Sequence, residues 1–123
     1  MTDEHAMRDA WDAFGGGYDQ AFSSSFTSIA RVALRFANVQ PGMRLLDVGC
    51  GPGSITLDLA GSVAEVVGID GAATAIVRAR AEAARRDVDN VEFHIADAYD
   101  LPFQDDTFDV VHAHQVLQHL ADP

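Results

Sequence analysis

The sequence predicts an α/β fold built on one parallel β-sheet. Short apolar segments that end on glycine or polar residues alternate with segments whose apolar residues have helical spacing. Strands joined by helices form crossovers of one hand, which make the sheet parallel and place helices on both of its faces. A length of 123 residues and a hydrophobic content of 48% allow one domain with a core, and not two of ordinary size.

The elements follow in an alternating order along the chain. The expected helices cover residues 4–14, 24–38, 54–60 and 72–86, with another beginning near residue 115, and the expected strands cover residues 43–48, 65–69, 91–95 and 108–113. The expected strand order in the sheet is 3-2-1-4. In that order the chain reverses direction between strands one and four, and ligands of open α/β sheets bind at the carboxyl ends of the strands near such a reversal.

The first predicted strand ends in a glycine-rich turn that an acid precedes. Residues 45–53 read LLDVGCGPG, with Asp47 two residues before Gly49. Glycine accepts positive φ and has no Cβ, so Gly49, Gly51 and Gly53 indicate a loop that a ligand approaches closely. The pyrophosphate of a dinucleotide would be repelled by Asp47, so a ligand with a positive end fits this turn better.

A second acid, Asp70, ends the next predicted strand 17 residues after Gly53. In nucleotide-binding α/β folds, a carboxylate at this place can accept hydrogen bonds from vicinal ribose hydroxyls. The same carboxylate could instead cap the helix that follows. Together the two acids would flank an adenosine with a cationic tail.

These residues resemble the glycine motif and the ribose acid of the class I S-adenosylmethionine-dependent methyltransferases, which have a Rossmann-like fold. Residues 95–103 (IADAYDLPF) and 108–120 (FDVVHAHQVLQHL) extend the resemblance. Both segments are similar to those of small-molecule methyltransferases of the ubiquinone and menaquinone biosynthesis type. The resemblance covers residues 41–123 and implies methyl transfer from S-adenosylmethionine to oxygen, carbon or nitrogen of a small molecule.

The resemblance implies a role for each residue of the two motifs. Asp47 and the carbonyl of Gly49 would bind the methionine ammonium. Gly51 and Gly53 would let the loop and the following helix close on the ligand, and Asp70 would bind the ribose.

The adenine end of the implied site departs from the family pattern. By resemblance, Asp97 would bind the adenine amino group and the Ala98 backbone N–H a ring nitrogen, although Asp97 could also be an acid in a solvated turn. A bulky apolar residue that packs on adenine usually follows the ribose acid, and Gly71 stands there instead. Candidates to replace it are Ile69, Tyr99 and Val116.

Other polar residues are further candidates. His114 could line the methionine end or be a structural histidine, and Tyr18 could contact the cofactor or the substrate from an N-terminal lid. His119 is the candidate general base, because imidazole titrates near neutrality, although its segment also reads as ordinary helix packing. His112, His114 and His119 lie close in the sequence, but we expect no metal site.

The resemblance also divides the chain. Residues 1–40 are expected to form an N-terminal helical lid segment, and residues 41–123 the cofactor-binding domain. The family fold has seven strands in the order 3-2-1-4-5-7-6, so we expect this domain to be truncated before strands 5–7. Strand four would then be an exposed apolar edge, which favours a homo-oligomer formed through this edge.

Charge and composition argue against several classes of partner. Eight Arg and no Lys stand against 19 acids, and a net charge of −11 disfavours nucleic acid. The chain lacks an apolar run long enough for a signal peptide or a membrane span, and its one cysteine allows no internal disulfide, so we expect a soluble cytoplasmic protein.

Two other functions stay open. The chain could be a non-catalytic cofactor-binding or interaction fragment, an alternative that Gly71 and the truncation support. A NAD-dependent oxidoreductase is disfavoured, because Ser54 stands where the dinucleotide fingerprint needs glycine or alanine.

Overall fold

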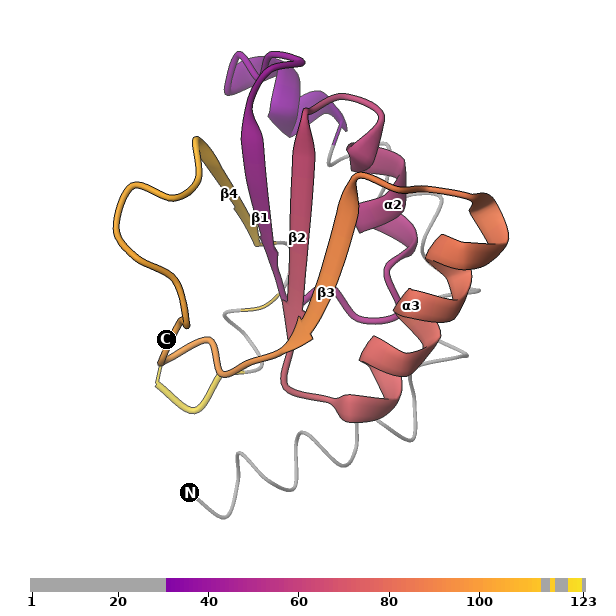
Figure 1. Cartoon of the computed structure of the whole chain (residues 1–123). Helices are drawn as coiled ribbons and strands as arrows, with labels where there is room; N and C mark the ends of the chain where they lie inside the picture. Colours follow the sequence, from indigo (N-terminus) through magenta and orange to yellow (C-terminus); the bar gives the residue numbers. More distant parts are fainter. Residues whose placement is uncertain (1–30, 114–115, 117–119, 123) are drawn as a thin grey trace.

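The computed structural model describes residues 31–113, 116 and 120–122, which contain one four-stranded parallel sheet, the helices α2 and α3, and a helical stretch at residues 31–36 (Figure 1). The strands are β1 (Arg44–Val48), β2 (Glu65–Asp70), β3 (Val91–Ile95) and β4 (Val110–Ala113), and the helices are α2 (Ser54–Ala60) and α3 (Ala73–Arg86). The strand order is β3-β2-β1-β4, with every neighbouring pair parallel. The predicted order and the Rossmann-like α/β class are confirmed.

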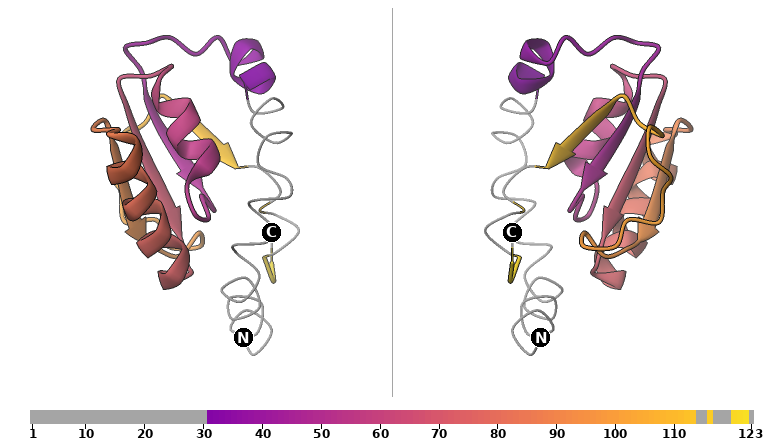
Figure 2. Two further views of the ribbon diagram at one scale, coloured as in Figure 1. Left: turned by 90° about the vertical axis from the view of Figure 1, so that its right-hand side faces the viewer. Right: turned by 90° about the vertical axis from the view of Figure 1, so that its left-hand side faces the viewer.

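Helices α2 and α3 cover the same face of the sheet (Figure 2). The crossovers from β1 to β2 and from β2 to β3 advance in one direction, so crossovers of one hand put α2 and α3 on one side. The return from β3 to β4 runs over the other face, where residues 96–109 form turns and bends. The helix predicted to begin near residue 115 lies mostly outside the described residues, so helices on both faces stay a prediction.

Apolar side chains fill both sides of the sheet. On the helix-covered side, Leu45 and Val66 pack with Leu59 of α2, while Phe93 packs with Ile76 of α3. On the other side, Leu46, Val67 and Ile69 are covered by loop residues, among which Phe103 and Phe108 pack edge to face with ring centroids 5.0 Å apart. Each fully buried side chain of this size contributes about 1.5–3 kcal/mol.

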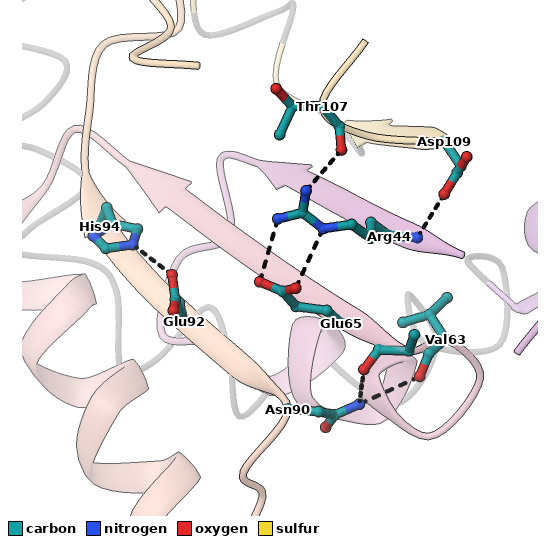
Figure 3. Close-up of polar contacts among 9 residues, drawn as sticks. Arg44, Val63, Glu65, Asn90, Glu92, His94, Thr107 and Asp109 are labelled. Carbon is teal, nitrogen blue, oxygen red and sulfur yellow. Dashed lines mark hydrogen bonds and ion pairs between the residues drawn. The ribbon is translucent and has the colours of Figure 1, made fainter. Parts of the chain in front are cut away.

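Polar contacts tie the strands together at their amino ends (Figure 3). The Arg44 side chain donates to Glu65 at 3.2 Å and to the Thr107 carbonyl at 3.1 Å, and the Arg44 backbone N–H donates to the Asp109 carboxylate at 2.9 Å. The Asn90 side-chain amide donates to the Ala60 carbonyl at 2.8 Å. These contacts fix the loops that enter β2, β3 and β4.

Strand four begins two residues later than predicted. Phe108 packs into the cluster beneath the loop, and Asp109 exchanges hydrogen bonds with Arg44 before the regular ladder starts at Val110. In the described residues β4 has a strand partner on one side only, and the Val111 side chain is 61% exposed. Pairing of this edge with a second copy stays a prediction.

The N-terminal segment is described only in part. Residues 31–36 are helical, as predicted for this stretch, and Leu34 packs against the core near Leu59. The remainder of the predicted lid, residues 1–30, lies outside the described residues. A helix with the length and apolarity needed to cross a membrane does not occur in the described part of the chain.

Candidate functional site

The glycine loop between β1 and α2 is anchored to the end of β2. The backbone N–H groups of Gly49 and Cys50 both donate to the Ile69 carbonyl, at 2.8 and 2.9 Å. Gly49, Gly51 and Gly53 have φ values of 72°, 56° and 88°, in the left-handed region that glycine tolerates best. The predicted close turn is therefore present at the carboxyl end of the sheet.

The three glycines differ in what a side chain would meet at each position. A Cβ at Gly49 would lie 2.5 Å from Val116 Cγ2, and a Cβ at Gly53 would lie 2.9 Å from Phe93 Cζ and 3.0 Å from Ala79 Cβ. A Cβ at Gly51 would meet nothing within 4 Å. Two glycines thus permit packing inside the protein, and Gly51 is the one whose α-carbon faces open space.

Asp70 lies beside Gly51. One oxygen of its half-buried carboxylate accepts the Gly51 backbone N–H at 2.9 Å, and the other accepts the backbone N–H of Ala72 at 2.9 Å, just before α3. Asp70 does not cap α3, because the N-cap is Ala72 and the structure gives this helix no side-chain cap hydrogen bond; the second bond instead closes the turn that leads into α3. The two bonds hold the carboxylate against the glycine loop, where a ligand beside Gly51 would also reach it.

Asp47 points into the protein. Its side chain accepts the Thr56 hydroxyl hydrogen bond at 2.6 Å and is hydrogen-bonded to His112 Nδ1 at 2.8 Å. Asp47 is only 3% exposed, and Thr56 is fully buried. The structure brings Asp47 to the glycine loop, as expected, but its contact with a ligand ammonium stays a prediction.

Cys50 lies in the loop between the two acids. Burial raises the pKa of its thiol well above the ordinary value, and the carboxylates of Asp47 and Asp70 raise the pKa further. The thiol is therefore protonated at pH 7 and unsuited to nucleophilic attack. Among the residues with a described position, no three His, Cys, Asp or Glu side chains lie close enough together to hold a metal ion.

Asp97 and Ala98 form a turn just after β3. The Asp97 carboxylate accepts a hydrogen bond from the Tyr99 backbone N–H at 2.9 Å. The Asp97 backbone carbonyl accepts one from the Asp100 backbone N–H at 3.0 Å. The Ala96 backbone N–H donates to the Asp70 carbonyl at 3.1 Å, which joins this turn to the end of β2. Asp97 is exposed in a solvated turn, as its alternative interpretation required, and its adenine contact stays a prediction.

The three candidates to replace the missing apolar residue at Gly71 differ in exposure and in what they contact. Ile69 is 1% exposed and packs in the core on the loop-covered side of the sheet, so it is not available to adenine. Val116 packs over Gly49. Tyr99 is 46% exposed, and its hydroxyl accepts the Asp122 backbone N–H at 2.6 Å. Tyr18, His114 and His119 lie outside the described residues.

Sequence reasoning missed Thr56 and His112 as partners of Asp47. The register of β1 and β4 pairs Asp47 with His112, so the two side chains lie next to each other on one face of the sheet. Aligning the two predicted strands from their carboxyl ends would have revealed this pair. Thr56 gave no comparable signal, because its burial depends on how α2 packs.

The chain belongs to the methyltransferase domain family, whose model matches residues 39–123. Nocamycin O-methyltransferase of Saccharothrix syringae is 38% identical over 106 residues, which is 84% of this chain and 38% of that protein. The 23S rRNA (uracil(1939)-C(5))-methyltransferase of Alkalilimnicola ehrlichii is 39% identical over 100 residues, or 78% of this chain and 22% of that enzyme. The chain thus spans well under half the length of these curated relatives.

Solved structures agree on the fold. The crystal structure of magnesium protoporphyrin IX methyltransferase from Synechocystis PCC 6803, with bound S-adenosylhomocysteine, matches with a TM-score of 0.79 at 22% identity. The match covers 96% of this chain and 61% of that one. The described sheet is therefore arranged as in a methyltransferase.

Proposed function

We propose that this chain is the cofactor-binding part of an S-adenosylmethionine-dependent methyltransferase that acts on a small molecule. The observation that carries the proposal is the pairing of Gly51 with Asp70. A positive-φ glycine with open space where a Cβ would stand lies 2.9 Å, from backbone nitrogen to carboxylate oxygen, from an acid at the end of the next strand. A nucleoside can approach the backbone there and meet a carboxylate at the same time.

Asp70 is suited to bind the ribose. The bonds from the Gly51 and Ala72 backbone N–H groups hold one oxygen each and fix the carboxylate beside the glycine loop. A ribose placed beside Gly51 would bring its hydroxyl groups within reach of this carboxylate. The carbonyl of Gly49, on the same loop, is proposed to accept a hydrogen bond from the methionine ammonium.

The turn after β3 is proposed to hold the adenine. Asp97 would accept from the adenine amino group, and the Ala98 backbone N–H would donate to a ring nitrogen. Because Gly71 supplies no apolar surface and Ile69 is buried in the core, we assign the packing against adenine to Tyr99, whose ring is partly exposed in this turn.

The chemistry needs little beyond binding and orientation. The cofactor is S-adenosylmethionine, which supplies a methyl group already activated on a sulfonium. A protein that aligns the acceptor with this methyl group and excludes water obtains much of the acceleration. A general base is optional, and His119 remains the proposed candidate, with Tyr18 and His114 as further contacts to the cofactor.

A small molecule is the proposed acceptor, methylated on oxygen, carbon or nitrogen. The relative from Saccharothrix syringae is named as an O-methyltransferase of nocamycin. The ribosomal RNA methyltransferase among the relatives raises the alternative of an RNA acceptor, but a net charge of −11 opposes a phosphate backbone. The sequence resemblance favours acceptors like those of the ubiquinone and menaquinone biosynthesis type.

Titration calorimetry with the purified chain tests the proposal. S-adenosylhomocysteine should bind and NAD should give no heat. Asp70→Ala should weaken the binding of S-adenosylhomocysteine more than tenfold, or about 1.4 kcal/mol. The matched control is Asp89→Ala, which removes the same charge from an exposed position after α3.

Two results would contradict the assignment. Unchanged affinity in Asp70→Ala would remove Asp70 from the site, and heat with NAD alone would point to an oxidoreductase. Because Asp70→Ala also removes the acceptor of two backbone N–H groups, thermal melting of each variant should accompany the titrations. Asp70→Asn, which keeps one acceptor oxygen, provides a second variant with less effect on folding.

A further inference from the structure

We propose that Asp47, Thr56 and His112 form a positioning unit for the methionine end of the cofactor, and that the Asp47 carboxylate does not touch the ligand. This inference rests on the proposed function and assigns a role to two residues that the sequence motif did not include. It replaces a direct contact between Asp47 and the ammonium with control of the loop that carries Gly49.

The burial of the Asp47 carboxylate supports an internal role. Asp47 is 3% exposed, and each of its oxygens already has a partner within the protein. The Thr56 hydroxyl lies at 2.6 Å from one oxygen, and His112 Nδ1 lies at 2.8 Å from the other. A buried carboxylate needs such donors, because an unpaired charge in the interior is strongly disfavoured.

The three residues join the three elements that surround the glycine loop. Asp47 is at the end of β1, directly before the loop, and Thr56 is in the first turn of α2, directly after it. Gly53 offers α2 no side-chain cap, so the bond from Thr56 to Asp47 is a side-chain tie between this helix start and β1.

His112 extends the tie to β4. Asp47 and His112 are paired in the register of β1 and β4, so their hydrogen bond joins neighbouring strands at the same level. Four residues later the chain reaches Val116, which packs over Gly49. The His112 bond therefore fixes both the strand before Gly49 and the strand that leads to the side chain covering it.

Substitution at His112 separates this role from general stabilisation. His112→Leu deletes the donor and leaves the Asp47 charge buried with one partner. In His112→Asn, the side-chain amide can place an N–H close to the position of Nδ1, which restores the bond. Thr56→Val removes the hydroxyl with little change of shape, and it tests the same unit from α2.

The ligands that distinguish the two roles are S-adenosylhomocysteine and 5′-methylthioadenosine, which shares the nucleoside thioether but lacks the amino-acid end. His112→Leu should weaken the binding of S-adenosylhomocysteine about tenfold, the cost expected for a lost buried hydrogen bond, and change that of 5′-methylthioadenosine less than about twofold. His112→Asn should recover most of the affinity. Thr56→Val should show the same selective loss and serves if His112→Leu does not fold.

Three outcomes would overturn the inference. Equal losses for both ligands would mean that the unit only stabilises the fold, and unchanged affinity for S-adenosylhomocysteine in both His112→Leu and Thr56→Val would mean that it has no role in binding. Failure of His112→Asn to recover binding would exclude the hydrogen bond as the cause. Wild-type chain that binds neither ligand would instead contradict the proposed function itself, which Asp70→Ala tests independently.

Discussion

The two ends of the sheet use polar residues in different ways. At the amino ends, polar side chains bond to one another and to the backbone of neighbouring elements, as Arg44 does with Glu65 and Thr107 and as Asp109 does with the Arg44 N–H, without glycines at positive φ in these contacts (Figure 3). At the carboxyl ends, the Asp70 carboxylate binds backbone N–H groups, and the loop beside it has glycines at positive φ. The contacts at the amino ends join neighbouring strands and loops. The contacts at the carboxyl ends fix the conformation of the glycine loop and leave open space beside Gly51.

The comparison extends to the two glycines that have open space beside them. A Cβ at Gly42, before β1, would meet nothing within 4 Å, and the same holds at Gly51 after β1. Gly42 does not have the positive φ that Gly51 has, and the Gly51 backbone N–H donates to the Asp70 carboxylate. Gly51 therefore combines open space with a fixed carboxylate, and this combination is what the proposed nucleoside site uses.

The largest expected effect is on stability, at Gly53. In Gly53→Ala the new Cβ would stand 2.9 Å from Phe93 and 3.0 Å from Ala79, at a φ of 88°. Overpacking and the unfavourable φ together should lower the free energy of unfolding by about 2–4 kcal/mol, as measured by urea denaturation. Gly42→Ala is the control, with an expected change within about 0.5 kcal/mol. Equal stability of the two variants would show that Gly53 is not a packing position.

The next effect is on binding, at Gly51. Gly51→Ala should cost only about 1–2 kcal/mol of stability, because the Cβ meets no neighbour and only the positive φ is unfavourable. Its Cβ would occupy the space proposed for the nucleoside, so the affinity for S-adenosylhomocysteine should fall more than about tenfold in titration calorimetry. Affinity equal to that of Gly42→Ala would place the ligand elsewhere.

The smallest effect concerns α3, away from both ends. Hydrogen bonds from Arg85 and Arg86 lower the pKa of Glu82 from 4.5 to about 2. A depressed carboxyl pKa contributes stability that is present above pH 4.5 and is lost as the pH falls toward 2. The melting temperature of Glu82→Gln should therefore be slightly below that of the wild type at pH 6 and equal to it at pH 2. The binding of S-adenosylhomocysteine should be unchanged. Because the Glu82 side chain is partly exposed to solvent, the difference should be small, and a difference that persists at pH 2 would contradict this origin.

Much of the fold could be predicted because local patterns determine it. The apolar segments indicated all four strands, and the expected order 3-2-1-4 is confirmed. The start of β4 was placed two residues early, because Phe108 is apolar but packs beneath the loop instead of extending the ladder. No helix was predicted between strands three and four, and the described residues have none there.

The candidate site could be predicted in its positions, and less well in its contacts. Spacing along the chain placed Gly51 and Asp70 at the same edge, because glycine turns and strand ends are local features. The inward orientation of Asp47 was not predicted, because it depends on Thr56 and on His112, which is 65 residues away in the sequence. Likewise, the difference between Gly51 and its neighbours depends on where Phe93, Ala79 and Val116 pack.

A crystal structure of this chain with S-adenosylhomocysteine, at a concentration that calorimetry shows to be saturating, tests the central claim most directly. The account predicts that the ribose hydroxyls lie within hydrogen-bond distance of the Asp70 carboxylate, with the ligand passing beside Gly51. A ligand bound away from this loop, or no density beside Gly51 under saturating conditions, would contradict it.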